Sequence, residues 1–259
     1  MRELTFGFSP CPNDTFAFHA LVHGLVDAPF RVRPVLLDIE ELNGAAREGR
    51  FDLTKLSVGA MSSAPAYRML RSGAALGHGV GPLVVARAPL SLEEAVGGRL
   101  AIPGRQTTAF LLLRLLGGEP ADARELRFDL ILDAVGRGEV DAGLIIHESR
   151  FTYQDHGLVK VADLGELWEA STSLPVPLAT ICARADLDLR DEAEAAIRAS
   201  VEYAFAHPEA SAEYVAEHSQ EMSPEVCRQH IELYVNEFSI DVGDAGLAAI
   251  EALTSAVPA

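Results

Sequence analysis

Apolar and polar residues alternate along the chain in a pattern that predicts two successive α/β units. Short apolar runs bounded by turn residues are typical of buried strands, and apolar residues repeating about every 3.6 positions are typical of helices. In the first unit we predict strands at 4–8, 31–37 and 53–57, with helices at 16–26 and 40–48 between them. Strands that alternate with helices favour a βαβαβ unit with a mainly parallel sheet.

The second unit repeats this plan further along the chain. We predict strands at 100–102, 127–128 and 140–146, with helices at 109–116 and 130–137. Gly-Arg-Phe-Asp at 49–52 and Gly-Glu-Val-Asp at 138–141 lead into the third strand of their respective units. Because the plan occurs only twice, it predicts two lobes of related architecture and not a solenoid.

Two further strands and a helical C-terminal segment complete the predicted fold. The strands are 80–86 and 174–183, and the second of these would cross back to the first lobe. Helices are predicted at 190–206, 211–218, 223–238 and 243–257. The predicted fold class is therefore a two-lobed α/β protein. Lobe one would comprise residues 1–88 and 184–259, lobe two residues 89–183, and a ligand cleft would lie between them.

Composition narrows the class of partner. The chain has 259 residues and a net charge of −17, which argues against nucleic acid or an anionic membrane surface as a partner. A small anionic ligand remains compatible, because the local field of a pocket can oppose the global charge. Three cysteines without metal spacing suit a reducing compartment. With no basic leader and no apolar stretch of membrane-spanning length, we expect a cytoplasmic protein.

His147 is the first candidate for chemistry. The apolar run 140–146 ends abruptly on this histidine, and ligands of open α/β sheets bind beyond the carboxyl ends of such strands. An imidazole at that position suits proton transfer near neutral pH. The alternative is a histidine that only caps the strand. Glu148, Ser149 and Arg150 would then either orient His147 or hold the turn.

Two predicted helix starts, at 13–15 and 107–108, would face the same cleft if the lobes are paired. Helix N-termini offer unpaired N–H groups and a partial positive charge, so both are suited to anions. Hydroxyl groups at Ser9 and Thr15, and polar strand ends at Lys55 and Ser57, add directional contacts. The alternative is a pair of ordinary helix caps. Together these features favour a cleft for a carboxylated, hydroxylated small molecule.

Cys11 and Lys55 each allow two interpretations. A cysteine at a helix start can be a nucleophile, but Cys11 lies between two prolines, and we favour a packing or pocket-wall role. Lys55 could form a Schiff base, pair with a ligand carboxylate, or be an exposed strand-end lysine. No glycine-rich nucleotide loop or zinc-protease motif occurs, and the histidines lack ligand spacing, so we predict no metal site.

Five segments in order then show a specific resemblance. They are SPCPNDTFAFHALVHG (9–24), LTKLSVGA (53–60), GVGPLVVAR (79–87), PGRQTTAFLLL (103–113) and GLIIHESRFTY (143–153). With these segments, and with YVNEFSIDVG (234–243), the chain resembles the 1,4-dihydroxy-6-naphthoate synthase family of the futalosine route to menaquinone. The resemblance covers about residues 4 to 242.

This resemblance implies a fold similar to periplasmic binding proteins of the second type. It also implies a cofactor-free conversion of cyclic dehypoxanthinyl futalosine to 1,4-dihydroxy-6-naphthoate, with release of a three-carbon fragment. The family's catalytic base corresponds to His147. Its substrate contacts correspond to Lys55, Leu56, Ser57, Thr107 and Thr108. Further residues expected at the pocket are Ser9, Cys11, Asn13, Asp14, Thr15, Arg105, Gln106 and Glu148.

Gln106 is the one departure we notice, because some relatives are expected to have histidine there. Two competing functions remain open at this point. One is chorismate dehydration by the sister family, whose SPCPNDTF segment is less similar to this one. The other is a non-catalytic receptor for a small carboxylate, since a fold does not fix a function. A homodimer is a further expectation that the sequence leaves open.

Overall fold

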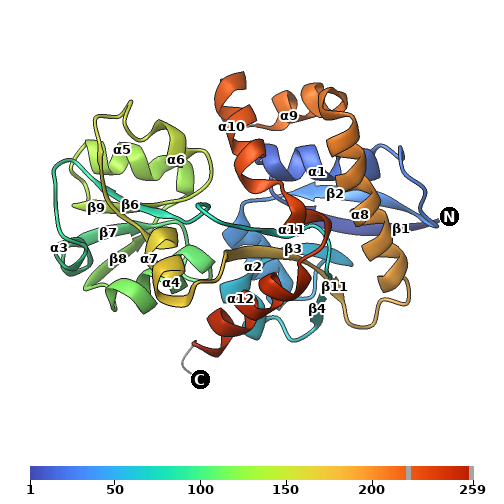
Figure 1. Cartoon of the computed structure of the whole chain (residues 1–259), viewed down its shortest axis with the longest axis horizontal. Helices are drawn as coiled ribbons and strands as arrows, with labels where there is room; N and C mark the ends of the chain where they lie inside the picture. The colour runs from blue at the N-terminus through green and yellow to red at the C-terminus, as the bar shows by residue number, and fades with distance from the viewer. Residues whose placement is uncertain (220–222, 257–259) are drawn as a thin grey trace.

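The computed structural model describes residues 1–219 and 223–256, which form two α/β lobes side by side (Figure 1). The first sheet has the order β2-β1-β3-β11-β4, with β5 also paired to β11. Its parallel strands are β1 (Arg2–Phe8), β2 (Phe30–Leu36) and β3 (Leu53–Ser57). They are connected by α1 (Pro12–Val22) and α2 (Ile39–Arg47). The predicted βαβαβ unit is confirmed, although α1 begins at Pro12, since proline is compatible with the first helical turn.

The second sheet has the order β10-β6-β9-β7-β8. Its parallel core is β7 (Arg99–Ile102), β8 (Asp122–Glu125) and β9 (Ala142–Ile145), connected by α4 (Thr108–Gly117) and α5 (Ile131–Gly136). The predicted strand at 127–128 is wrong. Phe128 begins a short 3-10 turn and packs into the interior, whereas the true edge strand is polar and partly exposed and therefore lacks an apolar run.

Each sheet also contains a strand that runs antiparallel to its core. β6 (Leu83–Ala86) pairs with β9 and with β10 (Val159–Asp163) in the second sheet. β11 (Val176–Arg184) pairs with β3, β4 (Tyr67–Met69) and β5 (Ala75–Gly77) in the first. The strand predicted at 80–86 therefore belongs to the second sheet, and the strand predicted at 174–183 belongs to the first. β6 precedes the predicted lobe boundary at 88/89 but pairs in the second sheet. β11 begins before the predicted boundary at 183/184 but pairs in the first sheet.

The two crossings between the lobes lie next to each other. Gly77 pairs with Val176 at the point where the two crossing segments meet. On the second-lobe side, α7 (Leu164–Thr172) covers the crossing, and the indole N–H of Trp168 donates to the carbonyl of Pro175 at 3.0 Å. One hydrophobic cluster also continues from Leu76 of the first lobe to Leu112 of the second. These contacts hold the two lobes together at the crossing segments.

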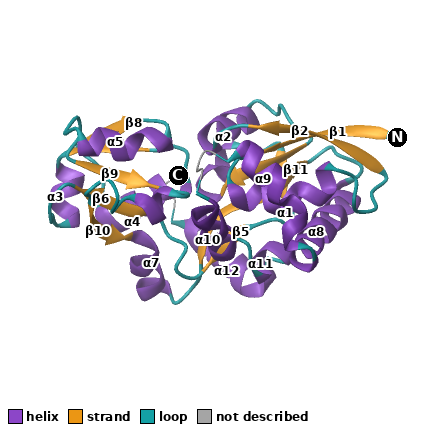
Figure 2. Ribbon diagram, turned by 90° about the horizontal axis from the view of Figure 1, so that it is seen from above, coloured by secondary structure: helices purple, strands orange, loops and turns teal. Residues whose placement is uncertain are grey.

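The C-terminal segment is helical, as predicted. Its helices are α8 (Arg190–Ala206), α9 (Ala212–His218), α10 (Pro224–Tyr234), α11 (Glu237–Ile240) and α12 (Gly243–Ser255). The helix predicted at 223–238 is interrupted because Asn236 starts α11 with its own side-chain cap. The end of the helix predicted at 243–257 extends beyond the described residues. Figure 2 shows α1, α8 and α9 gathered on one side of the first sheet, with α10 beside the junction of the lobes.

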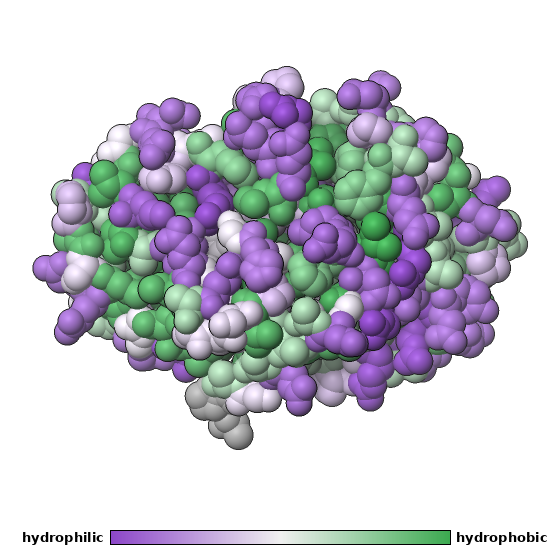
Figure 3. Space-filling model, in the orientation of Figure 1, coloured by the Kyte–Doolittle hydropathy of each residue, from purple (hydrophilic) through white to green (hydrophobic). Residues whose placement is uncertain are grey.

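Several elements were not predicted from the sequence. They are β4, β5, β10, α3 (Leu92–Gly97), α6 (Ser149–Thr152) and α7. In the part of the chain that the structure describes, no helix has the length and apolar character needed to cross a membrane. Hydrophilic residues occupy much of the face shown in Figure 3, as expected from the charge of the chain.

The backbones of Gly81 and Gly165 approach each other closely beside the crossing. A Cβ atom at Gly81 would lie 2.2 Å from the backbone nitrogen of Gly165, so Gly81→Ala should destabilise the fold by roughly 1–3 kcal/mol. Gly44→Ala, inside α2 with no atom within 4 Å of its added Cβ, is the matched control and should be neutral or stabilising by up to about 1 kcal/mol. Urea unfolding measures both. Equal free energies of unfolding for the two variants would contradict this packing.

Candidate active site

A pocket of about 60 Å³ lies where the two lobes and α10 meet. It brings together six residues that the sequence predicted from separate segments: Asn13, Lys55, Ser57, Thr107, Thr108 and His147. The remaining lining residues are Ile39, Ala75, Val80, Pro82, Ala109, Ile146, Leu178, Ala179, His230 and Tyr234. The two helix starts, at Asn13 and at Thr107 and Thr108, therefore border one pocket, as predicted for paired lobes.

Asp14 is the centre of a buried hydrogen-bond network at the start of α1. Its Oδ2 accepts from the backbone N–H of Ser9 at 3.0 Å and from the Ser9 hydroxyl at 2.7 Å. Its Oδ1 accepts from Nδ2 of Asn13 at 2.8 Å and from Nζ of Lys55 at 2.6 Å. Oδ1 of Asn13 has no hydrogen-bond partner among the described residues, so the Asn13 amide retains an acceptor at the pocket.

Lys55 and Asp14 form a buried ion pair, with side chains only 4% and 3% exposed. Removing one partner of such a pair costs about 3–5 kcal/mol, because the other charge is left buried and unpaired. Lys55 also lines the pocket, so its side chain can contact an anionic ligand there in addition to Asp14.

Strand alternation decides which side chains of β3 reach the pocket. Lys55 and Ser57 line it, whereas Leu56 points to the opposite side and packs against Tyr67 in the hydrophobic core. Of the five residues predicted to bind the substrate, Leu56 is thus the one that does not line the pocket. Ser57 is held by Asn43, whose amide donates to the Ser57 hydroxyl at 3.0 Å and accepts from its backbone N–H at 3.0 Å.

The start of α4 forms the second-lobe wall. Thr107 caps the helix by accepting from the backbone N–H of Phe110 at 3.2 Å. The Thr108 hydroxyl donates to the carbonyl of Leu178 at 2.6 Å and accepts from the N–H of Gly59 at 3.0 Å. Both hydroxyls already have protein partners, so the positive end of the helix dipole at the pocket is the main feature offered to an anion.

Arg105 and Gln106, both predicted near the pocket, have other roles. Arg105 is exposed and pairs with Glu125 at 3.0 Å, so its placement in the pocket is corrected. The backbone N–H and the side-chain amide of Gln106 donate to Glu40 of α2, at 3.1 and 3.3 Å. Gly104 leaves room for this contact, because an added Cβ would lie 2.4 Å from Cδ of Glu40. Burial raises the pKa of Glu40, which accepts these hydrogen bonds across the lobes.

His147 connects β9 to α6 in a left-handed backbone conformation, with φ of 56°. This conformation is uncommon outside glycine and concentrates at functional sites. The imidazole contacts Phe128 edge-on at 4.8 Å between centroids, and its Nε2 has no hydrogen-bond partner in the described residues. Burial lowers the pKa of His147 to about 4 although Glu148 opposes the shift. The ring is therefore neutral at neutral pH.

Glu148 and Arg150, which follow His147, have different partners. Glu148 is only 6% exposed, and its Oε2 lies 3.5 Å from Nδ1 of the equally buried His230. Burial would raise the pKa of Glu148, but the adjacent imidazoles of His230 and His147 outweigh burial and lower it. Arg150 instead donates to Asp163 at 2.7 Å, and Asp163 caps α7. Arg150 thus holds the turn, while Glu148 faces a second histidine.

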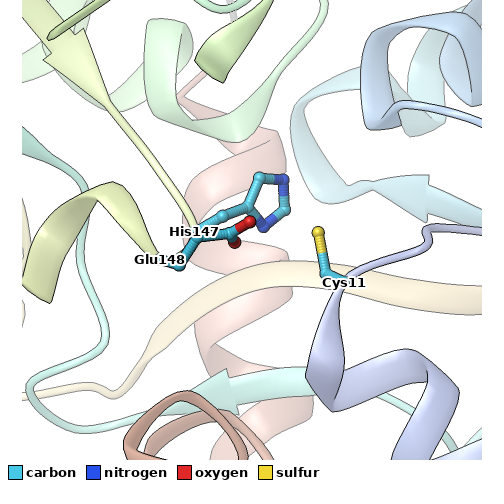
Figure 4. A group of neighbouring side chains, drawn as sticks. All are labelled: Cys11, His147 and Glu148. Carbon is cyan, nitrogen blue, oxygen red and sulfur yellow. The ribbon is translucent and has the colours of Figure 1, made fainter. Parts of the chain in front are cut away.

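Cys11 approaches His147 and Glu148 from the start of α1, as Figure 4 shows. One ligand-type atom from each lies within 4.8 Å of the others. Burial, reinforced by Glu148, raises the pKa of Cys11 well above its usual range. A protonated thiol is poorly suited to act as a nucleophile, and Cys11 is buried without lining the pocket. Thr15 is also internal, since its hydroxyl bonds to the carbonyl of Cys11.

Sequence reasoning missed four polar residues at or beside the site: Glu40, Asn43, His230 and Tyr234. His230 and Tyr234 occur four positions apart on α10, a spacing that places them on one helix face. That spacing was the available signal, but their position opposite His147 depends on a packing between distant segments. Burial raises the pKa of Tyr234, so this hydroxyl is neutral.

This architecture and site define a two-lobed α/β protein of the periplasmic-binding-protein type, with its pocket between the lobes. A crystal structure of a protein from Archaeoglobus fulgidus is similar, with 36% identity, a TM-score of 0.91, and coverage of 98% of this chain and 96% of that one. The ligand-binding component of an ABC-type import system from Staphylococcus aureus shares the fold at 14% identity, with a TM-score of 0.71 and coverage of 98% and 91%.

Sequence comparison identifies the family. A family profile described as menaquinone biosynthesis matches residues 4–258. A protein from Thermus thermophilus named 1,4-dihydroxy-6-naphthoate synthase is 55% identical, over 98% of this chain and 93% of that protein. Another protein of that name, from Streptomyces coelicolor, is 46% identical over 96% and 91%. The chain belongs to this family and is an enzyme of menaquinone biosynthesis, which confirms the predicted resemblance.

The lowered pKa of His147 can be measured directly. In an NMR titration of the folded protein, the imidazole signal missing from His147→Gln should have its midpoint near pH 4. The unfolded histidine titrates near about pH 6.5 and so binds more protons between these values. The free energy of unfolding should consequently fall as the pH falls from 6.5 towards 4. A midpoint near 6.5 would contradict the desolvation of His147.

Proposed function

We propose that this enzyme converts cyclic dehypoxanthinyl futalosine to 1,4-dihydroxy-6-naphthoate, with His147 as the general base. The observation that carries the proposal is a neutral histidine with an unpartnered Nε2, which lines the same pocket as a fixed cation at Lys55. The names of the two relatives support the identity of the product. A carboxylated substrate fits the cation and the start of α4.

In the proposed reaction, neutral His147 removes a proton from the spiro-sugar portion of the substrate. A carbon–carbon bond then breaks, the naphthalene ring becomes aromatic, and the three-carbon fragment leaves after taking up a proton. Aromatisation supplies driving force, so the protein mainly positions the substrate, accepts the proton and stabilises developing negative charge. Lys55 and the N–H groups at the start of α4 are suited to the last task.

The present pocket corresponds to a closed arrangement. Its volume of about 60 Å³ is small beside the roughly 300–1,000 Å³ that is usual for small-molecule sites. The substrate would therefore enter when the lobes or α10 move apart. Renewed closure would exclude water from the reaction. The Glu40–Gln106 contact and the Thr108–Leu178 hydrogen bond join the two sides in the closed arrangement.

Incubation of the purified protein with cyclic dehypoxanthinyl futalosine and, separately, with chorismate tests the proposal. We expect the naphthoate to form from the cyclic substrate and chorismate to remain unchanged, as followed by chromatography. His147→Ala should lower the rate by roughly 10²–10⁴-fold. His207→Ala, at an exposed position, should leave it unchanged. Turnover of chorismate alone would identify a dehydratase, and binding without turnover would identify a receptor; either result would refute the proposal.

A further inference from the structure

His230 and Glu148 form a buried pair that the proposed role of His147 does not use. Nδ1 of His230 and Oε2 of Glu148 lie 3.5 Å apart, and neither atom has a hydrogen-bond partner among the residues described. His230 is only 1% exposed, yet it lines the pocket together with His147. The two imidazole rings are nearly parallel, with 6.2 Å between their centroids.

Structural packing alone does not account for this arrangement. Buried polar groups in proteins normally have hydrogen-bond partners, and a buried carboxylate without a paired charge is costly. Here a helix from the C-terminal segment brings a histidine to the carboxylate, on the wall of the pocket that already contains the proposed base. A catalytic role is one of the reasons for which native proteins keep buried polar atoms without hydrogen-bond partners.

We propose that His230, supported by Glu148, is a second catalytic residue that donates a proton to the departing three-carbon fragment. This inference rests on the proposed function. That reaction splits one substrate into two products without net gain or loss of protons. A proton removed at one position must therefore be returned at another.

His147 takes a proton from the spiro centre on the side that becomes the naphthoate, and the electron pair left there forms a double bond on that side. The carbon–carbon bond to the three-carbon fragment breaks at the same time, and its electron pair goes to the departing fragment. The imidazolium of His230 delivers a proton to that electron pair and becomes a neutral imidazole. His147 later releases its proton and His230 regains one, through solvent, when the pocket opens. The Glu148 carboxylate stabilises the positive charge on His230 before the transfer.

The other ionisable side chains near the pocket are less suited to donate this proton. Lys55 is held by Asp14 at 2.6 Å. Burial raises the pKa values of Tyr234 and Cys11, so both are weak acids. His147 itself accepts the first proton. His230 is therefore the donor that remains on the wall contributed by α10.

Steady-state kinetics of His230→Ala and His230→Gln on the cyclic substrate test this role. We expect kcat to fall by about 10²–10⁴-fold with little change in KM, and millimolar imidazole to restore part of the activity of His230→Ala. Glu148→Gln should lower kcat in the same direction by a smaller factor. Gln229→Ala, the neighbouring position on α10, is the control for disturbance of the helix and should keep wild-type kcat and KM.

Two results would overturn the role of His230. One is a kcat close to that of the wild type in both His230 variants. The other is a loss of activity that imidazole does not restore and that accompanies a raised KM and a lowered melting temperature, since this would indicate packing. Both require turnover by the wild-type enzyme. Failure of the wild type to form the naphthoate would instead refute the proposed function, so the two failures are distinguishable.

Discussion

The buried ion pair between Lys55 and Asp14 is the constraint on which the site depends. It joins the end of β3 to the start of α1, two elements that neighbour each other only because the βαβαβ unit places β1 beside β3. Ser9 and Asn13 complete the bonding of the carboxylate. A charge pair with this little exposure requires such complete bonding. The same pairing holds an ammonium group at the pocket wall.

The second lobe contributes groups of a different kind. His147 is neutral because burial lowers its pKa to about 4, whereas the pKa of Glu148 is lowered despite its burial, chiefly by the adjacent His230. A neutral base, an ionised carboxylate and a fixed cation thus occupy neighbouring positions in one desolvated site. Electrostatic interactions in such a site are stronger than in water. The net charge of −17 is therefore a poor guide to the field that a substrate meets in the pocket.

The sequence predicted the parts of the fold that depend on local pattern. The parallel βαβαβ units, the strand ending at His147 and both helix starts followed from apolar runs and capping residues. The pairing between strands that are distant in the sequence could not be predicted from apolar runs. The exchange of β6 and β11 between the sheets depends on long-range contacts, and β8 is a polar edge strand without an apolar run.

The residues of the site were likewise predictable where they depend on local pattern and not where they depend on long-range packing. Lys55, Ser57 and His147 lie at strand ends, where parallel sheets bind ligands, and were predictable on that ground. Leu56 was included with its neighbours although strand alternation turns it into the core. Arg105 follows a predicted turn, but its long side chain reaches Glu125 at the surface. His230 reaches the pocket only through the packing of α10, which no local pattern near residue 230 encodes.

A crystal structure of the enzyme with bound 1,4-dihydroxy-6-naphthoate would test the central claim most directly, namely that chemistry occurs in the pocket between the lobes. We predict that the naphthalene ring occupies this pocket, with the carboxylate at Lys55 or at the start of α4. The imidazole of His147 should contact the ring or its hydroxyl groups. Binding of the naphthoate at another surface, or in this pocket without contact to His147, would contradict the account.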